Sequence, residues 1–270
     1  MTSSQSAISA LKYAIEHTPV GMLPQQHSNL QKLNVDEATS DEITSSLRDY
    51  EERHLRQIPI EDSSFILSPY NKDSSNYYYD QTKRYKLQIS PLSNNFDKLE
   101  KIEDSSSLQK QLSKAVGDYL DKYFTKKNSS FNVYETNGNG QWSVTVLIAS
   151  HHINVEGMQN GEWVETYVVS KKEDNVYEVN GDVKVNTFCF EDSNTHFHLH
   201  ESVKECISAK DNQELCEKLV EVIEKKDNQI QTQLKDAFAN FAVDYMKPLR
   251  RKIPLTGTKM KWTLNQLALK

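Results

Sequence analysis

The sequence predicts an α+β fold in which helices flank one antiparallel sheet and a basic segment follows the last helix. Three observations lead there: apolar residues at helical spacing near the N-terminus, short alternating strands in the middle, and a single apolar stripe at helical spacing over about 35 residues. The 270 residues suffice for one large domain or two small ones.

Residues 1–58 are predicted to form an N-terminal helical stalk. Apolar residues fall on one helical face over 7–15, and a proline and Gly21 then end this helix. A short second helix is expected over 30–34, and a third, with charged residues on its outer face, over 40–56.

Residues 59–128 are predicted to form a small β region followed by a helix. Aromatic and β-branched residues give 65–67, 77–79 and 85–89 the composition of strands. An apolar stripe over 105–124 then predicts the helix.

Residues 129–205 are predicted to form an antiparallel meander of about five strands. Runs of alternating apolar and polar residues at 130–136 and 141–150 are joined by Asn-Gly-Asn-Gly, a strong signal for a hairpin. A last short strand is expected over 195–200.

Two further Asn-Gly pairs in this region are interpreted as turns. Asn160-Gly161 would precede a strand at 163–170, and Asn180-Gly181 would separate strands at 176–179 and 183–190. A sheet of this size requires a cover on its face.

Residues 206–247 are predicted to form one long helix that supplies this cover. Asp211 and Glu214 are spaced as in a capping box, and Pro248 stops the helix because the residue before a proline is driven from the helical region. Its single apolar stripe, from Leu215 to Tyr245, fits either packing over a sheet or pairing with a second long helix.

Residues 248–270 form a basic, amphipathic C-terminal segment. The chain has a net charge of −6, yet no Asp or Glu occurs from 245 to 270, where seven Lys and Arg occur. Met260, Leu264 and Leu267 recur at helical spacing after the predicted core has ended. An apolar stripe framed by bases favours a segment that docks in a partner's groove, with nucleic acid and anionic membrane as alternatives.

Nothing in the sequence points to catalysis. Phosphate-binding, zinc-protease and nucleophile-elbow motifs are absent, so no catalytic residue, metal or cofactor is expected. His196, His198 and His200 would share one strand face, but they would spread over about 13 Å, which favours a polar outer face over a metal site. Three cysteines without pairing logic and no signal peptide indicate a cytoplasmic or nuclear protein.

Three segments resemble those of F-actin capping protein alpha subunits. The run LRRKIPLTGTKMKW at 249–262 resembles the family's C-terminal signature L-R-R-x-L-P-[VI]-T-R-T-K-[IV]-x-W. The run IEHTPVG at 15–21 resembles the end of its first helix, and Asn160-Gly-Glu-Trp163 resembles its mid-sheet N-G-x-W segment. Gly257 departs from the signature, because the family usually has a base there. The tail is also shorter than in animal relatives, which fits a fungal-type subunit.

The resemblance implies a non-enzymatic subunit that binds the barbed end of an actin filament independently of calcium and blocks subunit addition and loss. It implies a stalk, a sheet continued across an alpha/beta heterodimer, a long helix over the sheet and a C-terminal tentacle. Lys247 and Arg251 match bases that contact actin and phosphatidylinositol bisphosphate. The expected actin-binding residues are Lys247, Arg250, Arg251, Lys259, Lys261, Trp262, Leu264 and Leu267.

The implied partners are an obligate beta subunit, the barbed end, phosphatidylinositol bisphosphate and regulators such as twinfilin, with no nucleic acid. The implied location is the cytoskeleton, in cortical actin patches. Two alternatives stay open: a lipid- or partner-binding cytoskeletal scaffold without capping activity, and, more distantly, a metal hydrolase that uses the histidine strand.

Overall fold

The computed structural model describes nine stretches of the chain. These are residues 3–33, 37–60, 63–73, 75–80, 85–101, 106–125, 127–138, 141–190 and 194–240. The chain divides into two units, Met1–Val220 and Glu221–Lys270, and the boundary falls within the last helix. No helix in these stretches is long and apolar enough to cross a membrane.

The N-terminal segment forms three helices, α1 (Ser3–Glu16), α2 (Leu23–Gln31) and α3 (Glu37–Arg53). The expected helices over 7–15 and 40–56 are confirmed within a few residues. The second expectation is wrong: α2 begins at Leu23 rather than at residue 30, because Pro24 lies in its first turn, where a missing N–H costs nothing. The helices share one apolar cluster, Ile15, Leu23, Leu30, Ile43, Leu47 and Tyr50.

Two small antiparallel sheets follow, and their strands partly match the expected ones. The first pairs β1 (Gln57–Ile60) with β2 (Ser63–Ile66). The second has the order β3 (Tyr78–Asp80), β4 (Tyr85–Ile89), β5 (Phe96–Lys101), and a 3-10 turn, η1 (Pro69–Asn71), precedes it. The sequence did not suggest β1 and β5. Both sheets contribute to one core, Ile58, Ile60, Phe65, Leu67, Tyr78, Leu87 and Ile89.

Helix α4 (Ser107–Tyr123) forms where a helix was expected and packs on the neighbouring strand β6. Ser106 caps it by accepting a hydrogen bond from the backbone of Gln109. The side chain of Gln109 in turn donates to the carbonyl of Val133 at 2.6 Å. The buried stripe of α4 therefore contacts the sheet both through apolar packing and through this bond.

Five strands in the described residues form the main sheet: β6 (Ser129–Gly138), β7 (Gln141–Asn154), β8 (Gln159–Glu173), β9 (Val176–Cys189) and β10 (Thr195–Ser208). They pair antiparallel in sequence order, so the expected five-strand meander is confirmed. The last strand is longer than expected, since it extends to Ser208 instead of ending near residue 200.

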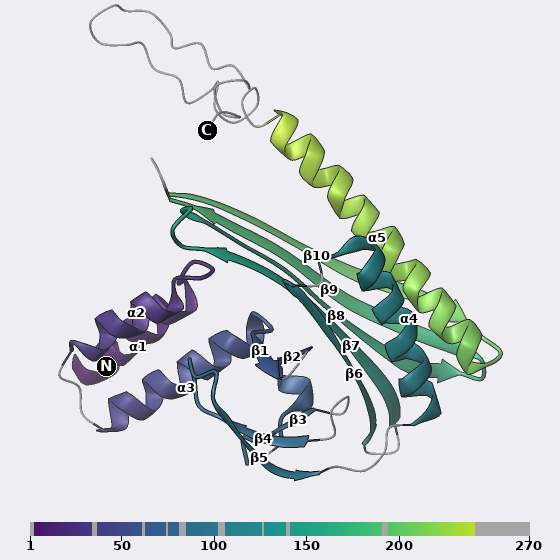
Figure 1. Ribbon diagram of the computed structural model, residues 1–270, viewed down its shortest axis with the longest axis horizontal. Coiled ribbons are helices and arrows are strands. Elements are labelled where there is room, and N and C mark those ends of the chain that lie inside the picture. The colour runs from purple at the N-terminus through teal and green to yellow at the C-terminus, as the bar shows by residue number, and fades with distance from the viewer. Residues whose placement is uncertain are drawn as a thin grey trace, which may run out of the picture. The chain divides into compact units, whose positions relative to one another are not determined.

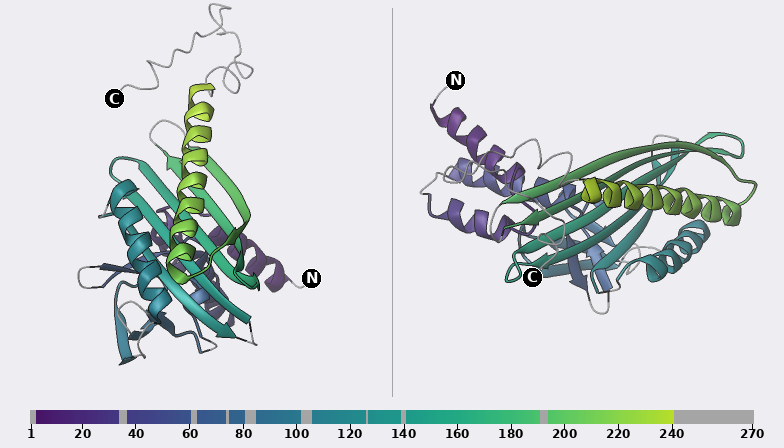
Figure 2. Two further views of the ribbon diagram at one scale, coloured as in Figure 1. Left: turned by 90° about the vertical axis from the view of Figure 1, so that its right-hand side faces the viewer. Right: turned by 90° about the horizontal axis from the view of Figure 1, so that it is seen from above.

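The two faces of this sheet carry different covers. On one face, Leu55, which follows α3, and Ile66 of β2 pack against Tyr134, Leu147, Ala149 and Val164. Helix α4 lies on the opposite face, as Figure 1 and the two turned views of Figure 2 show. Successive side chains along a strand point to opposite faces, so alternate residues of each strand face the same cover.

The two Asn-Gly pairs expected to be turns lie inside strands instead. The turns are at 155–158 and 174–175, where Met158 and Asn175 take positive φ angles of 56° and 61°. Gly181 is needed for a close approach rather than for a turn: a Cβ there would lie 2.6 Å from the ring of Tyr167, its register partner on β8.

Replacing Gly181 by alanine is expected to destabilise the protein by about 1–3 kcal/mol, because the added methyl group overlaps the buried Tyr167 ring. The urea unfolding midpoint measures this. Gly161→Ala is the matched control, since its Cβ would meet its nearest neighbour at an ordinary 3.7 Å. A Gly181→Ala midpoint equal to that of the control would contradict the explanation.

Helix α5 (Asn212–Asn240) begins with the expected cap and starts later than expected. Asp211 accepts from the backbone of Glu214 at 2.8 Å, and Glu214 accepts from the backbone of Lys210 at the same distance. Residues 206–208, assigned to this helix from sequence, belong to β10. Residues 241–247 lie outside the described stretches, and so does the whole predicted tentacle.

Candidate functional site at the junction of helices and sheet

The predicted actin- and lipid-binding residues cannot be placed, because they all lie beyond residue 240. This group is Lys247, Arg250, Arg251, Lys259, Lys261, Trp262, Leu264 and Leu267, together with the unusual Gly257. The other two segments that suggested the family lie in the described part of the chain. The structure brings these two together.

Strand β8 contacts the turn after α1 through Asn160. Its side-chain amide donates to the carbonyl of Val20 at 3.0 Å, and its oxygen accepts from the backbone of Asn154 at 3.0 Å. Gly21 makes this approach possible: its φ is +80°, and a Cβ there would lie 2.6 Å from the Asn160 amide nitrogen. The segment at 15–21 and the N-G-x-W segment thus form one joint.

Glu162, the variable residue of that second segment, is the centre of the joint. Register places His151, Glu162, Asn186 and His198 side by side in one row across β7 to β10. The Oε1 atom of Glu162 lies 2.7 Å from Nδ1 of His54 and accepts a hydrogen bond from the Asn186 amide at 2.5 Å. The Oε2 atom of Glu162 lies 3.5 Å from Nε2 of His151.

The carboxyl of Glu162 stays ionised although the side chain is only 2% exposed. Burial by itself raises its pKa, but hydrogen bonds from His151 and His54 outweigh burial and lower the pKa to about 2. A buried carboxylate held in this way fixes its neighbours rather than exchanging protons with a substrate.

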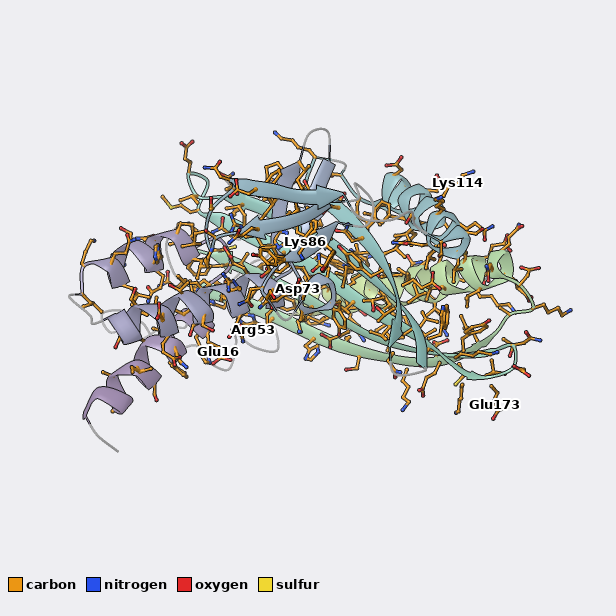
Figure 3. The ribbon with its side chains drawn as sticks, turned by 90° about the horizontal axis from the view of Figure 1, so that it is seen from below. Glu16, Arg53, Asp73, Lys86, Lys114 and Glu173 are labelled. Carbon is orange, nitrogen blue, oxygen red and sulfur yellow. The ribbon has the colours of Figure 1, made fainter. Side chains whose placement is uncertain are left out.

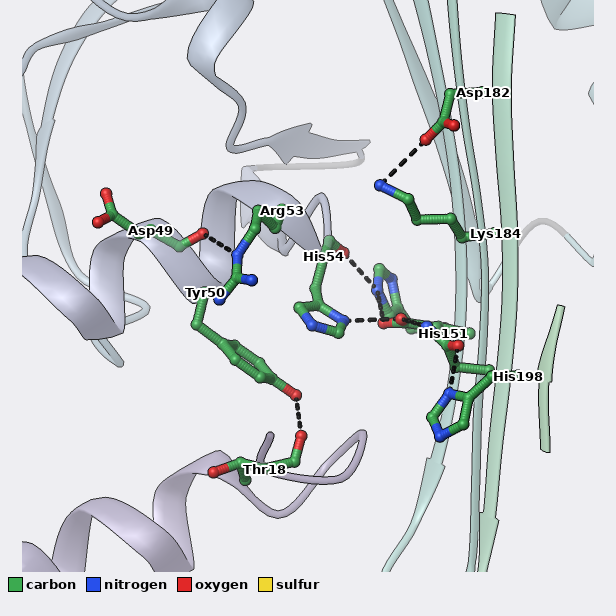
Figure 4. A network of polar contacts seen from close by, with 11 residues as sticks. Thr18, Asp49, Tyr50, Arg53, His54, His151, Asp182, Lys184 and His198 are labelled. Carbon is green, nitrogen blue, oxygen red and sulfur yellow. Dashed lines mark hydrogen bonds and ion pairs between the residues drawn. The ribbon is translucent and has the colours of Figure 1, made fainter. Parts of the chain in front are cut away.

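The end of helix α3 meets the row through His54 and Tyr50 (Figure 4). The two rings stack with centroids 4.0 Å apart. The Tyr50 hydroxyl donates to the carbonyl of Thr18 at 2.9 Å, and burial together with the charge of Glu162 raises the pKa of Tyr50. The Tyr50–Thr18 bond therefore links α3 to the segment after α1, and the His54–Glu162 contact links the end of α3 to strand β8.

A cavity of about 310 Å³ lies beside these groups. Its charged wall groups are already paired: Arg53 binds Glu16 at 2.9 Å (Figure 3), and Lys184 binds Asp182 at 3.0 Å. The lining residues are Glu16, His17, Thr18, Pro19, Val20, Arg53, His54, Glu162, Lys184, Asn186, His196 and His198.

The histidines of β10 share one face, as expected, but each has a different neighbour. His196 packs against Phe188, Nδ1 of His198 donates to Asn186 at 2.8 Å, and His200 contacts Asp182. Within the described stretches, no three His, Cys, Asp or Glu side chains are arranged to hold a metal ion.

Helix α3 is also bonded to the small sheets through two buried glutamates. Glu51 pairs with Arg56 and accepts from the backbone of Leu92 at 2.7 Å. Glu52 pairs with Lys72 at 2.7 Å and accepts from the Tyr78 hydroxyl at 2.6 Å. The charged residues of this helix were expected on its outer, solvated face, which is wrong for these two buried carboxylates.

Comparison with known proteins settles the family. A sequence model of the F-actin capping protein alpha subunit matches residues 11–269. The chain belongs to this family. Among curated relatives, the alpha subunit of Kluyveromyces lactis is 24% identical over 87% of this chain and 85% of its own length. That of Saccharomyces cerevisiae is 24% identical over 96% and 93%.

A solved alpha-subunit structure has the same fold. The homodimeric actin capping protein alpha subunit from Plasmodium berghei matches with a TM-score of 0.76 and 16% identity, over 86% of this chain and 92% of that one. At this identity the likeness concerns the fold alone. It supports the mixed helix-and-sheet architecture described above.

In this capping-protein subunit, the sequence pattern indicated the segment that contains Glu162 but not Glu162 itself. The sequence did contain a signal, because Glu162 lies on the same inward-packing face of β8 as Asn160 and Val164. A charged residue at such a position needs partners. The sequence could not identify them, because His54 is 108 residues away.

Proposed function

We propose that this chain is the alpha subunit of a heterodimeric capping protein that binds filament barbed ends without calcium and blocks subunit addition and loss. The observation that carries this is the family match, which extends through the basic tail to residue 269. The alpha subunits of Kluyveromyces lactis and Saccharomyces cerevisiae match over 85% and 93% of their own length.

The proposed mechanism divides attraction and retention between two features of the tail. Lys247, Arg250, Arg251, Lys259 and Lys261 attract an acidic filament end and raise the association rate. The apolar stripe of Trp262, Leu264 and Leu267 then docks on terminal actin subunits and slows release.

The same bases suit anionic lipid. We assign Lys247 and Arg251 to binding of phosphatidylinositol bisphosphate, which would compete with actin for the tail. The protein would act in the cytoplasm on cortical actin patches, where regulators such as twinfilin would meet it.

The proposed obligate partner is a beta subunit that extends the main sheet along β10. β10 is a terminal strand in the order of the main sheet, β10-β9-β8-β7-β6. A partner can continue a sheet by adding a strand beside its terminal strand. The Plasmodium berghei relative, described as homodimeric, shows that an alpha subunit of this fold can assemble in pairs.

Thiol reactivity tests whether the beta subunit lies along β10. Cys189 and Cys206 are exposed in the chain, and Cys206 lies on β10. In the heterodimer, Cys206 is expected to react with iodoacetamide several-fold more slowly than Cys189. Cys216 is an internal control that stays unreactive, because burial raises its pKa to about 11. Equal rates at Cys189 and Cys206 would place the partner elsewhere.

The function itself is tested by pyrene-actin elongation from filament seeds with the full-length chain co-expressed with a beta subunit. Nanomolar heterodimer is expected to stop barbed-end growth equally with calcium and with EGTA. A folded heterodimer that leaves barbed-end growth unchanged would contradict the capping proposal. The scaffold alternative would then be pursued by measuring binding to vesicles that contain phosphatidylinositol bisphosphate.

A further inference from the structure

Glu162 is a nearly fully buried carboxylate, and it needs a compensating positive charge. Its side chain is 2% exposed, and the carboxylate contacts His54, His151 and Asn186. Asn186 is neutral, so the compensating charge must come from one of the two imidazoles. An uncompensated buried carboxylate would cost several kcal/mol.

The contacts of His151 favour its neutral form. Nε2 of His151 lies 2.9 Å from the carbonyl of His54, and a carbonyl only accepts, so Nε2 carries the hydrogen. Nδ1 of His151 is buried and has no hydrogen-bond partner among the described residues. A second proton there would leave a buried N–H unsatisfied.

The contacts of His54 favour its charged form. Its Nδ1 lies 2.7 Å from Glu162 and its ring stacks on Tyr50. Helix α3 ends at Arg53, so the imidazole lies at the negative end of a helix dipole. The side chain is 22% exposed, which gives water access for proton exchange.

Charged groups on the surrounding elements leave this balance in place. On α3, Arg53 is offset by Glu16 of α1, and on β9, Lys184 is offset by Asp182. On β10, burial and the neighbouring His196 lower the pKa of His198, so this histidine adds little positive charge. His17, after α1, bonds the carbonyl of Tyr13. Glu162 remains the charge that acts on His54 at close range.

We propose that the proton on His54 operates a latch that holds the C-terminal end of helix α3 against strand β8. With the proton, His54 and Glu162 form an ion pair beside the Tyr50–Thr18 bond. Without it, Glu162 has only neutral donors and the end of α3 opens more often. A fall in pH therefore favours the closed latch, and a rise in pH favours its opening.

Hydrogen exchange of the intact heterodimer tests the latch. The opening equilibrium of residues 50–55, after correction for the chemical exchange rate, is expected to rise about fivefold from about pH 5 to about pH 8, as for a partly exposed ion pair. His54→Gln keeps a hydrogen-bond donor but carries no charge, so its opening should not change with pH.

Two controls separate the latch from general pH effects. His152→Gln changes an exposed histidine on the same strand as His151 and should keep the wild-type slope. His151→Gln should keep the slope as well, with more opening at every pH. A pH-independent opening in the wild type overturns the proposal whether or not any variant folds. A wild-type slope that persists in His54→Gln, or in Glu162→Gln, also overturns it.

Discussion

Ending the chain after Lys247 is expected to weaken barbed-end capping by at least about 100-fold. The truncation removes Trp262, Leu264 and Leu267, and burying such side chains contributes about 1.5–3 kcal/mol each. Since 1.4 kcal/mol is tenfold in affinity, two well-buried residues already account for this factor. Dilution-induced depolymerisation and seeded elongation with the truncated heterodimer measure it.

Two substitution sets separate the roles proposed for the tail. Serine at Trp262, Leu264 and Leu267 should raise the dissociation rate and leave the salt dependence of association unchanged. Alanine at Lys247, Arg250 and Arg251 should slow association and flatten its dependence on salt. Capping that survives truncation within a few-fold would mean that the tail does not retain the filament end.

The sequence predicted the main sheet better than it predicted the turns between its strands. Alternation over 141–150 and the four-residue Asn-Gly repeat correctly placed β6 and β7. The other two Asn-Gly pairs misled, because asparagine and glycine also serve inside strands. Asn160 bonds a distant carbonyl at 3.0 Å, and Gly181 makes room for Tyr167. Both reasons depend on tertiary contacts that a local pattern does not contain.

The candidate joint was only partly predictable for the same reason. The residues around Asn160 and those at 15–21 were each noticed as family-like segments, but nothing local indicated that they meet. The bond from Asn160 to Val20 spans 140 residues of sequence. The burial of Glu51 and Glu52 could not be predicted either, because their helix carries many exposed charges. Only the packing of the small sheets shows which carboxylates are enclosed.

Glu162→Ala is expected to destabilise the protein by about 3 kcal/mol, the largest effect on stability expected of any single side chain in the joint. The substitution leaves His54 and the Asn186 amide facing a cavity without their common acceptor. Glu173→Ala removes the same side chain from an exposed position on the same strand and should have little effect. Urea midpoints of the two heterodimers provide the comparison.

The stability difference between the wild type and Glu162→Ala should decrease as the pH falls. The pKa of Glu162 falls from 4.5 to about 2 on folding, so the stability contributed by its ionisation is present just above pH 4.5. This contribution, about 3 kcal/mol by linkage, is lost as the pH falls from about 4.5 toward 2. The gap between wild type and Glu162→Ala should therefore narrow on acidification, while the small gap for Glu173→Ala should not change. A gap that stays constant down to the lowest pH at which the proteins remain folded would show that Glu162 acts through packing alone, and its charge would then have no part in holding the helices on the sheet.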